Sequence, residues 1–267
     1  MKLSAIKTLL CGLVVALMCF AEMAAAQVAT VAELTGFVQA TPPIGGAASR
    51  TLRKGDTLNQ GDTIATAAAS SVVIRFADGQ VAALSALSRL QISVYVYAPK
   101  EPAKNNVLIS LLQGGMRSIT GLIGRARPQA VSYRAASATI GIRGTDVNIV
   151  VDGGVVGVSV NDGEISFTFA GQTVTIPAGQ AAVGSGSTIK SVPAAQLIAA
   201  LIAQGANPNG PLIKALNDLA APALESAVTK AVTTEPPKNQ NQNQNQNSGT
   251  QQGKPNNNSG GGSASKG

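Results

Sequence analysis

Short runs of alternating apolar and polar residues, many of them ending in a turn signal, dominate residues 27–190 of this 267-residue chain. The first clear run is 72–77, which Asp78-Gly79 follows, and the alternation recurs at 90–97, 147–151, 156–160 and 165–169. A period of two places alternate side chains on a buried face, and Asp-Gly favours a tight hairpin turn. The pattern predicts an antiparallel meander of short strands, closing into one β sandwich or roll that is large enough to hold its own core.

The first 26 residues have the order of a secretory signal peptide. Two lysines precede an apolar run at 9–20, and Ala24 and Ala26 supply small residues for cleavage before Gln27. The run is shorter than the roughly 20 residues that a membrane-spanning helix needs. We therefore expect an exported protein, periplasmic or extracellular, with no transmembrane segment after signal cleavage.

Both cysteines, Cys11 and Cys19, lie in that segment, and the chain contains no histidine. The mature protein would then lack the nitrogen and sulfur ligands that zinc and copper prefer, as well as the commonest general base near neutral pH. Acylation of Cys19 is an alternative, disfavoured because Leu17 and Met18 put no small residue before it. We expect no metal site, no cofactor and no catalytic residue, and therefore not an enzyme.

Two further zones follow the β region. Residues 191–234 carry apolar side chains at helical spacing in two stretches, 194–202 and 212–224, and predict two amphipathic helices. These helices would cover the edge or mouth of the β domain, or form a hairpin that binds a partner. Residues 235–267 are rich in Asn, Gln, Gly and Ser, so we expect a disordered tail that serves as a spacer or as an assembly element.

An ordered series of motifs spans residues 55–183. They are Lys54-Gly55-Asp56-Thr57, Gln60-Gly61-Asp62-Thr63-Ile64-Ala65-Thr66, Phe76-Ala77-Asp78-Gly79, Gly114-Gly115-Met116-Arg117, Ile140-Gly141-Ile142-Arg143-Gly144-Thr145, Asp162-Gly163-Glu164-Ile165 and Ala178-Gly179-Gln180. In this order they resemble the FecR domain family. The resemblance implies a periplasmic or secreted all-β domain of jelly-roll or rolled-sheet type without a catalytic role. In the iron-regulatory members it also implies sensing linked to an outer-membrane receptor and an extracytoplasmic sigma factor.

Only about seven residues precede the apolar run at the start of the chain, so we do not expect a sigma-binding segment to carry over. What carries over is the domain, with Gly141, Arg143, Gly144, Thr145 and Asp146 at the positions of the family signature.

The signature arginine, Arg143, lies between Gly141 and Gly144 just before a predicted strand. Glycines at such a place supply a positive φ or room for another backbone. We expect Arg143 to pack its stem under the sheet and to fork onto a carboxylate or carbonyl groups, which would fix a bend. The alternative is an arginine that faces a ligand and holds an anion.

A run of arginines surrounds the signature, because residues 117–143 contain no acidic side chain. Arg117, Arg125, Arg127 and Arg134 are therefore candidates for an anion-binding face. The alternative is that acids from elsewhere in the fold pair with them. The acidic pairs Asp56/Asp62 and Asp162/Glu164 stand in turn-like contexts, and we predict turn roles for them.

Taken together, these patterns favour an exported, non-catalytic module that binds or scaffolds in the cell envelope or extracellular matrix. The alternative is a periplasmic regulatory partner of a membrane or outer-membrane sensor. The formal net charge of +7 suits an envelope or matrix protein, or an acidic glycan or lipopolysaccharide, as the partner. With 3% aromatic residues we expect no specific nucleic-acid recognition. The pattern leaves the oligomeric state open.

Overall fold

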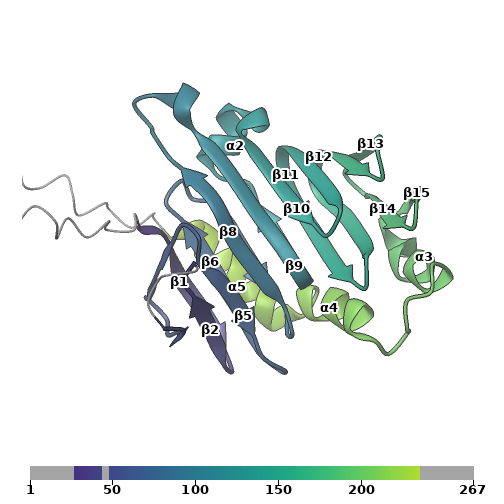
Figure 1. The fold of residues 1–267 in the computed structure, drawn as a ribbon, viewed down its shortest axis with the longest axis horizontal. Helices are drawn as coiled ribbons and strands as arrows, with labels where there is room; N and C mark the ends of the chain where they lie inside the picture. Colours follow the sequence, from purple (N-terminus) through teal and green to yellow (C-terminus); the bar gives the residue numbers. More distant parts are fainter. Residues whose placement is uncertain (1–26, 44–47, 235–267) are drawn as a thin grey trace, which may run out of the picture. The chain divides into compact units, whose positions relative to one another are not determined.

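The computed structural model describes residues 27–43 and 48–234 of the chain. The predicted signal peptide, with Ala24 and Ala26, and the predicted tail at 235–267 lie outside the described residues. The described part is mostly β, with a 15-stranded sheet followed by a few helices (Figure 1). The mostly-β class with C-terminal helices that the sequence predicts is confirmed.

The strands differ widely in length. They are β1 (Gln27–Thr35), β2 (Val38–Thr41), β3 (Arg50–Thr51), β4 (Thr57–Asn59), β5 (Thr63–Thr66), β6 (Ser71–Phe76), β7 (Val81–Leu84), β8 (Arg89–Val96), β9 (Asn106–Ile119), β10 (Val131–Ala135), β11 (Ala138–Asp152), β12 (Val155–Phe169), β13 (Gln172–Pro177), β14 (Gln180–Ser185) and β15 (Thr188–Pro193). All pairings are antiparallel except that of β9 with β10. That exception follows from the connection through α2 (Leu122–Ala126) and the 3-10 helix η2 (Pro128–Ala130).

The long strands β9, β11 and β12 change partners midway. The first half of β9 pairs with β8 and β10, whereas its second half pairs with β7 and β11. The first half of β12 likewise pairs with β14 and the second with β13. Gly114, with φ of 84°, marks the change in β9, and a register shift between Arg143 and Asp146 marks it in β11. The sheet therefore rolls, and both of its parts bury side chains in one core.

That core is the first of two hydrophobic clusters. It takes Ile74 and Phe76 from β6, Ile109 from β9, and Tyr133 from β10, among many others. The Phe76 and Tyr95 rings stack within it, with centroids 5.2 Å apart. These residues come from the inward positions of the alternating runs, so the period of two predicts this cluster correctly.

The second cluster lies on the outer side of β6, β7, β11 and β14. Val73 and Val81 belong to it, whereas their neighbours Val72 and Ala82 belong to the first, because successive side chains of a strand point to opposite faces. Three helices cover this side: α3 (Leu197–Ala203), α4 (Pro211–Leu219) and α5 (Pro222–Thr233). The 3-10 helices η1 (Pro102–Lys104) and η3 (Ala194–Gln196) complete the elements. None of the helices in the described part of the chain is long and apolar enough to cross a membrane.

Three sequence predictions about the elements are wrong. The stretch at 212–224 predicts one helix, but the chain forms α4 and α5, which break at Ala220 and Ala221 before Pro222. Asp162-Gly163 predicts a hairpin turn, but β12 runs through both residues as an irregularity in its pairing with β11. The helices also pack on a face of the sheet, not on its edge or mouth.

Candidate functional site

The turn between β6 and β7 carries a buried carboxylate. Asp78 is fully buried, and its Oδ1 accepts hydrogen bonds from the Tyr95 hydroxyl at 2.8 Å and from the Gln80 amide at 3.0 Å. Its Oδ2 accepts one from the amide of Ile123 at 3.2 Å. Burial, and then the charge of Asp78, raises the pKa of Tyr95 far above its usual range, so the hydroxyl stays protonated as a donor. Asp78 therefore fastens the turn to β8 and to the start of α2.

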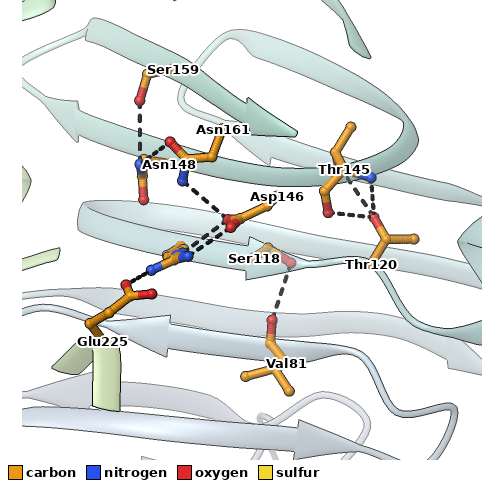
Figure 2. A network of polar contacts seen from close by, with 10 residues as sticks. Val81, Ser118, Thr120, Thr145, Asp146, Asn148, Ser159, Asn161 and Glu225 are labelled. Atoms are coloured by element: carbon orange, nitrogen blue, oxygen red, sulfur yellow. Dashed lines mark hydrogen bonds and ion pairs between the residues drawn. The ribbon is translucent and has the colours of Figure 1, made fainter. Parts of the chain in front are cut away.

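A second polar centre lies where β9, β11 and β12 bend, under α5 (Figure 2). The Arg117 guanidinium donates from Nε to Asp146 Oδ1 at 2.9 Å and from Nη2 to Asp146 Oδ2 at 2.7 Å. Its Nη1 donates to Glu225 of α5, and Asn161 Nδ2 adds a bond to Asp146 Oδ1 at 3.2 Å. The Arg117 side chain is only 13% exposed. Two parallel hydrogen bonds to one carboxylate fix both the position and the orientation of the guanidinium group. Arg117 therefore connects Asp146, at the bend of the sheet, to Glu225 of α5.

The signature residues lie together at the same bend. Thr145 is buried, its amide donates to Thr120 Oγ1 at 2.8 Å, and its carbonyl accepts from the Thr120 amide at 2.9 Å. Gly144 and Gly163 face each other on β11 and β12 with φ of 60° and 76°. A Cβ on Gly163 would lie 2.2 Å from the Gly144 carbonyl oxygen. The glycines therefore allow two backbones to approach more closely than any side chain would permit.

The expectation for Arg143 is wrong in its geometry. Its side chain is 75% exposed, and its ion-pair partner, Glu164, is 3.5 Å away and itself 40% exposed. Alternation along β11 explains this, because Ile142 takes the inward position and turns Arg143 outward. The fork onto a carboxylate that the sequence led us to expect of Arg143 is made by Arg117 with Asp146.

The four arginines predicted as an anion-binding face do not share one face. Arg117 lies beneath α5 and is paired with two acids, as the alternative interpretation of the run expects. Arg134 is exposed on β10, where its neighbour Tyr133 points into the core. Arg125 is exposed in α2, and Arg127 donates to the Pro102 carbonyl at 2.6 Å. Anion binding by Arg125, Arg127 or Arg134 stays a prediction.

The acidic pairs have different roles. Asp56 Oδ2 accepts from the Arg53 amide at 2.8 Å, and Asp62 Oδ2 accepts from the Asn59 amide at 3.0 Å, which confirms their turn roles. Asp62 is buried and also pairs with Arg50 at 2.7 Å. Asp162 and Glu164 lie in the irregular part of β12, not in a turn.

Residues 62–166 match the family model described as FecR protein. The match includes Asp62, Asp78, Arg117 and the signature residues, whereas Glu225, the α5 partner of Arg117, lies outside it. This part of the chain is a FecR domain. The resemblance that the ordered motifs indicate is thereby confirmed.

Two of the solved structures that resemble the chain are described as a "putative anti-sigma factor" from Parabacteroides distasonis ATCC 8503. They share 16% sequence identity with the chain, at TM-scores of 0.40 and 0.41, over 52% of this chain in each case. The chain spans 64% and 63% of the lengths of those proteins, somewhat less than two thirds. Among curated proteins, none matches the chain.

Segments outside the FecR match complete the fold around the FecR domain. The helix α5 is attached by Glu225 to Arg117, by the Ala231 carbonyl to the buried Arg75, and by Lys230 to Glu33 of β1 at 2.7 Å. Lys54 binds the same Glu33 oxygen at 2.6 Å. Burial lowers the pKa of Arg75, which remains charged near neutral pH. The sequence motifs do not predict these contacts of α5, because each contact joins residues that are far apart in sequence.

Proposed function

We propose that the chain is an exported regulatory protein that acts without catalysis by binding a membrane or outer-membrane sensor of the cell envelope. The observation that carries the proposal is the match of residues 62–166 to the FecR protein family. A sensing role linked to an outer-membrane receptor is what the resemblance implies for the iron-regulatory members of that family. A matrix or scaffold role, which the sequence alone favoured, gains no support from the match, and the regulatory alternative fits it better.

The signal-like order of residues 1–26 supports the location in this proposal, because it would deliver the FecR domain to the periplasm. The polar centres support the mode of action. Asp78, Asp146 and Arg117 form their hydrogen bonds within the fold, which suits a rigid module that binds a partner through its surface.

The test is envelope fractionation of cells that express the tagged protein from its own promoter, followed by chemical crosslinking and identification of the products by mass. We expect the protein in the periplasm, crosslinked to one sensor or receptor at a fixed ratio. Recovery chiefly from the culture medium or the extracellular matrix, with no crosslinked sensor, would reject the proposal and restore the scaffold interpretation.

A further inference from the structure

One side of the rolled sheet has no helix on it among the described residues. This side points away from the first cluster, and we call it the open face. It is formed by β5, β8, β10, the first halves of β9 and β11, and the second half of β12. The helices α3, α4 and α5 bury their apolar side chains in the second cluster, which contains no strand residue of the open face. In Figure 1, α5 passes behind the strands near β6 and α4 lies below the end of β9, whereas β8 and β9 run in front.

An apolar corner marks one end of the open face. Phe37, Leu87 and Leu112 are 49%, 45% and 48% exposed, respectively. The Leu87 amide donates to the Ala67 carbonyl at 3.2 Å, and the Ala67 amide donates to the Phe37 carbonyl at 3.0 Å. Leu87, Ala67 and Phe37 therefore form a row across three turns. Leu112 lies at the register shift where β9 passes β8 at Arg89. Phe37 and Leu87 in neighbouring turns, with Leu112 at the adjoining register shift of β9, are more than the scattered exposure of an ordinary surface.

The backbone of this corner is strained and tightly held. Leu87 has φ of 55°, a left-handed conformation that is uncommon for a bulky residue. Buried hydroxyl groups fix its turn: Thr66 Oγ1 donates to the Ser85 carbonyl at 2.6 Å, and the Ser88 amide donates to Thr66 Oγ1 at 2.9 Å. The Gly115 amide donates to Ser88 Oγ at 2.9 Å. The surrounding hydrogen bonds hold Leu87 in a strained backbone conformation while its apolar side chain is exposed. Strain that is maintained in this way points to a function for the Leu87 side chain.

Phe37 is fixed in the same way. Its amide donates to Ser70 Oγ at 2.9 Å, and Gly36 before it has φ of 73°. A Cβ on Gly36 would lie 2.3 Å from Ser70 Oγ, so no other residue fits there without a shift. Both anchors are therefore preorganised, and ordering them would cost a partner little entropy.

The charges on the open face are mainly positive. Arg89, Arg134 and Arg143 are exposed on β8, β10 and β11, on the same side as Leu112. The acidic side chains on the strands of this face are Glu164, which lies beside Arg143, and the exposed Asp162 at the bend of β12. Arg89 pairs with Gln113 of β9 and Arg134 with Ser110, so they are two strand spacings of about 4.8 Å across the sheet and three residues along it, or about 14 Å apart. The remaining outward positions are largely Ser, Thr and Gln.

We propose that the open face is the docking surface for an acidic protein, whose apolar side chains cover Phe37, Leu87 and Leu112 while its carboxylates pair with Arg89, Arg134 and Arg143. This inference rests on the proposed function and names the surface through which the sensor would be bound. The arginines of the open face favour an acidic protein as the partner, because their charges are complementary to its carboxylates. A lipid surface fits less well, because Arg134 and Arg143 lie on β10 and β11, away from the apolar corner, and do not ring it.

The first test uses nuclear magnetic resonance of the isotope-labelled exported protein with a synthetic peptide rich in Asp and Leu. We expect amide shifts confined to the open face and its corner, and binding that weakens as salt rises. A peptide with Lys in place of Asp should bind at least tenfold more weakly. Shifts scattered over both sides of the sheet, or tighter binding to phosphatidylglycerol vesicles than to the acidic peptide, would overturn the proposal.

Matched variants separate the anchor from the fold. Asn tolerates a left-handed φ better than Leu, so Leu87→Asn should keep or raise the unfolding midpoint while it weakens peptide binding about tenfold or more. Ala170 has φ of 48° in the β12–β13 turn, and Ala170→Asn should give the same stability gain with unchanged binding. Arg134→Glu should weaken binding more than Lys190→Glu on β15. Equal binding by Leu87→Asn and the unaltered protein would remove the corner from the interface.

A third measurement distinguishes this proposal from the proposed function. A photocrosslinking residue is placed at Leu112 on the open face, or at Ile202, which is 38% exposed on α3, in cells that produce the full chain. Crosslinks to the sensor from position 112 and not from 202 support both proposals. Crosslinks from 202 alone overturn the docking surface and leave the regulatory function standing. Peptide binding at the open face without any sensor crosslink rejects the regulatory function and keeps the surface.

Discussion

At the residue scale, the arginine that holds the fold is not the one that the motif emphasises. Arg143 belongs to the signature, yet its guanidinium lies in solvent, whereas Arg117 forms a fork with Asp146 and reaches Glu225. The difference depends on which side of its strand each residue takes and on which strand is its neighbour. The pairing of Ser118 with Val147 sets that neighbourhood, and no local pattern encodes it.

Arg117→Lys should therefore lower stability, because lysine keeps the charge but cannot make the fork. Hydrogen bonds to charged groups contribute about 1.5–3 kcal/mol each, and the 13% exposure of Arg117 leaves little room for water to replace them. We expect the thermal midpoint to fall by several degrees. Arg143→Lys, at 75% exposure, should leave it nearly unchanged. Equal losses in the two variants would contradict the assignment.

The two glycines of the bend offer a second comparison. Gly144→Ala should cost about 1–2 kcal/mol for the left-handed φ, since nothing lies within 4 Å of a Cβ there. Gly163→Ala should cost on the order of 3 kcal/mol or more, because its Cβ would also overlap the Gly144 carbonyl oxygen. Urea unfolding of both variants measures the difference. Similar losses of stability in the two variants would mean that β11 and β12 can move apart at the bend without a cost in unfolding free energy.

At the scale of elements, alternation predicts the strands well and their ends poorly. The Asp78-Gly79 and Asp152-Gly153 turns form as expected, whereas Asp162-Gly163 lies inside β12. The same dipeptide serves a turn or a bulge, and only the opposite strand, with Gly144, decides between them. Helical periodicity likewise continues across Ala220 and Ala221, so it hides the break. Pro222 at the first position of α5 is the signal that locates it.

The attachment of α5 to β1 should depend on pH. Hydrogen bonds from Lys230 and then Lys54 lower the pKa of Glu33, with a small opposing effect of burial. A lowered pKa stabilises the fold above the unfolded value of about 4.3, and that contribution is lost as the pH falls through the folded pKa. The protection factors of the α5 amides, which correct for the slower intrinsic exchange in acid, should therefore fall, relative to pH 6, when the pH drops below about 4.

Glu33→Gln isolates this effect from that of Glu225, the other carboxylate that attaches α5. In this variant the protection factors at the end of α5 near Lys230 should already be lower at pH 6 and should change less on acidification. An acid response as large as that of the unaltered protein would assign the pH dependence to Glu225 or to other groups.

At the scale of the whole molecule, the sequence predicts the class of the fold and the inward face of its strands, but not the assembly of its surfaces. Arg117 and Arg134 stand 17 residues apart in one basic run, yet the roll of the sheet sends them to opposite outer sides. Phe37, Leu87 and Leu112 come from three separate segments, and their proximity depends on turn pairings that are not local. Long-range register is therefore the information that the motifs lack.

The last prediction concerns the dependence of the β region on its helices. The second cluster is shared between strands and helices, so a chain ending at Pro193 would expose Val73, Val81, Val150 and Val183 and lose partners such as Leu201 and Leu219. Each fully buried aliphatic side chain contributes about 1.5–3 kcal/mol, and a typical domain is stable by only about 5–15 kcal/mol. Residues 27–193 should therefore bind a hydrophobic dye and unfold without cooperativity, whereas 27–234 should melt as one cooperative unit at the midpoint of 27–267. A cooperative, monomeric 27–193 fragment would mean that the rolled sheet is stable by itself and that its helices are dispensable.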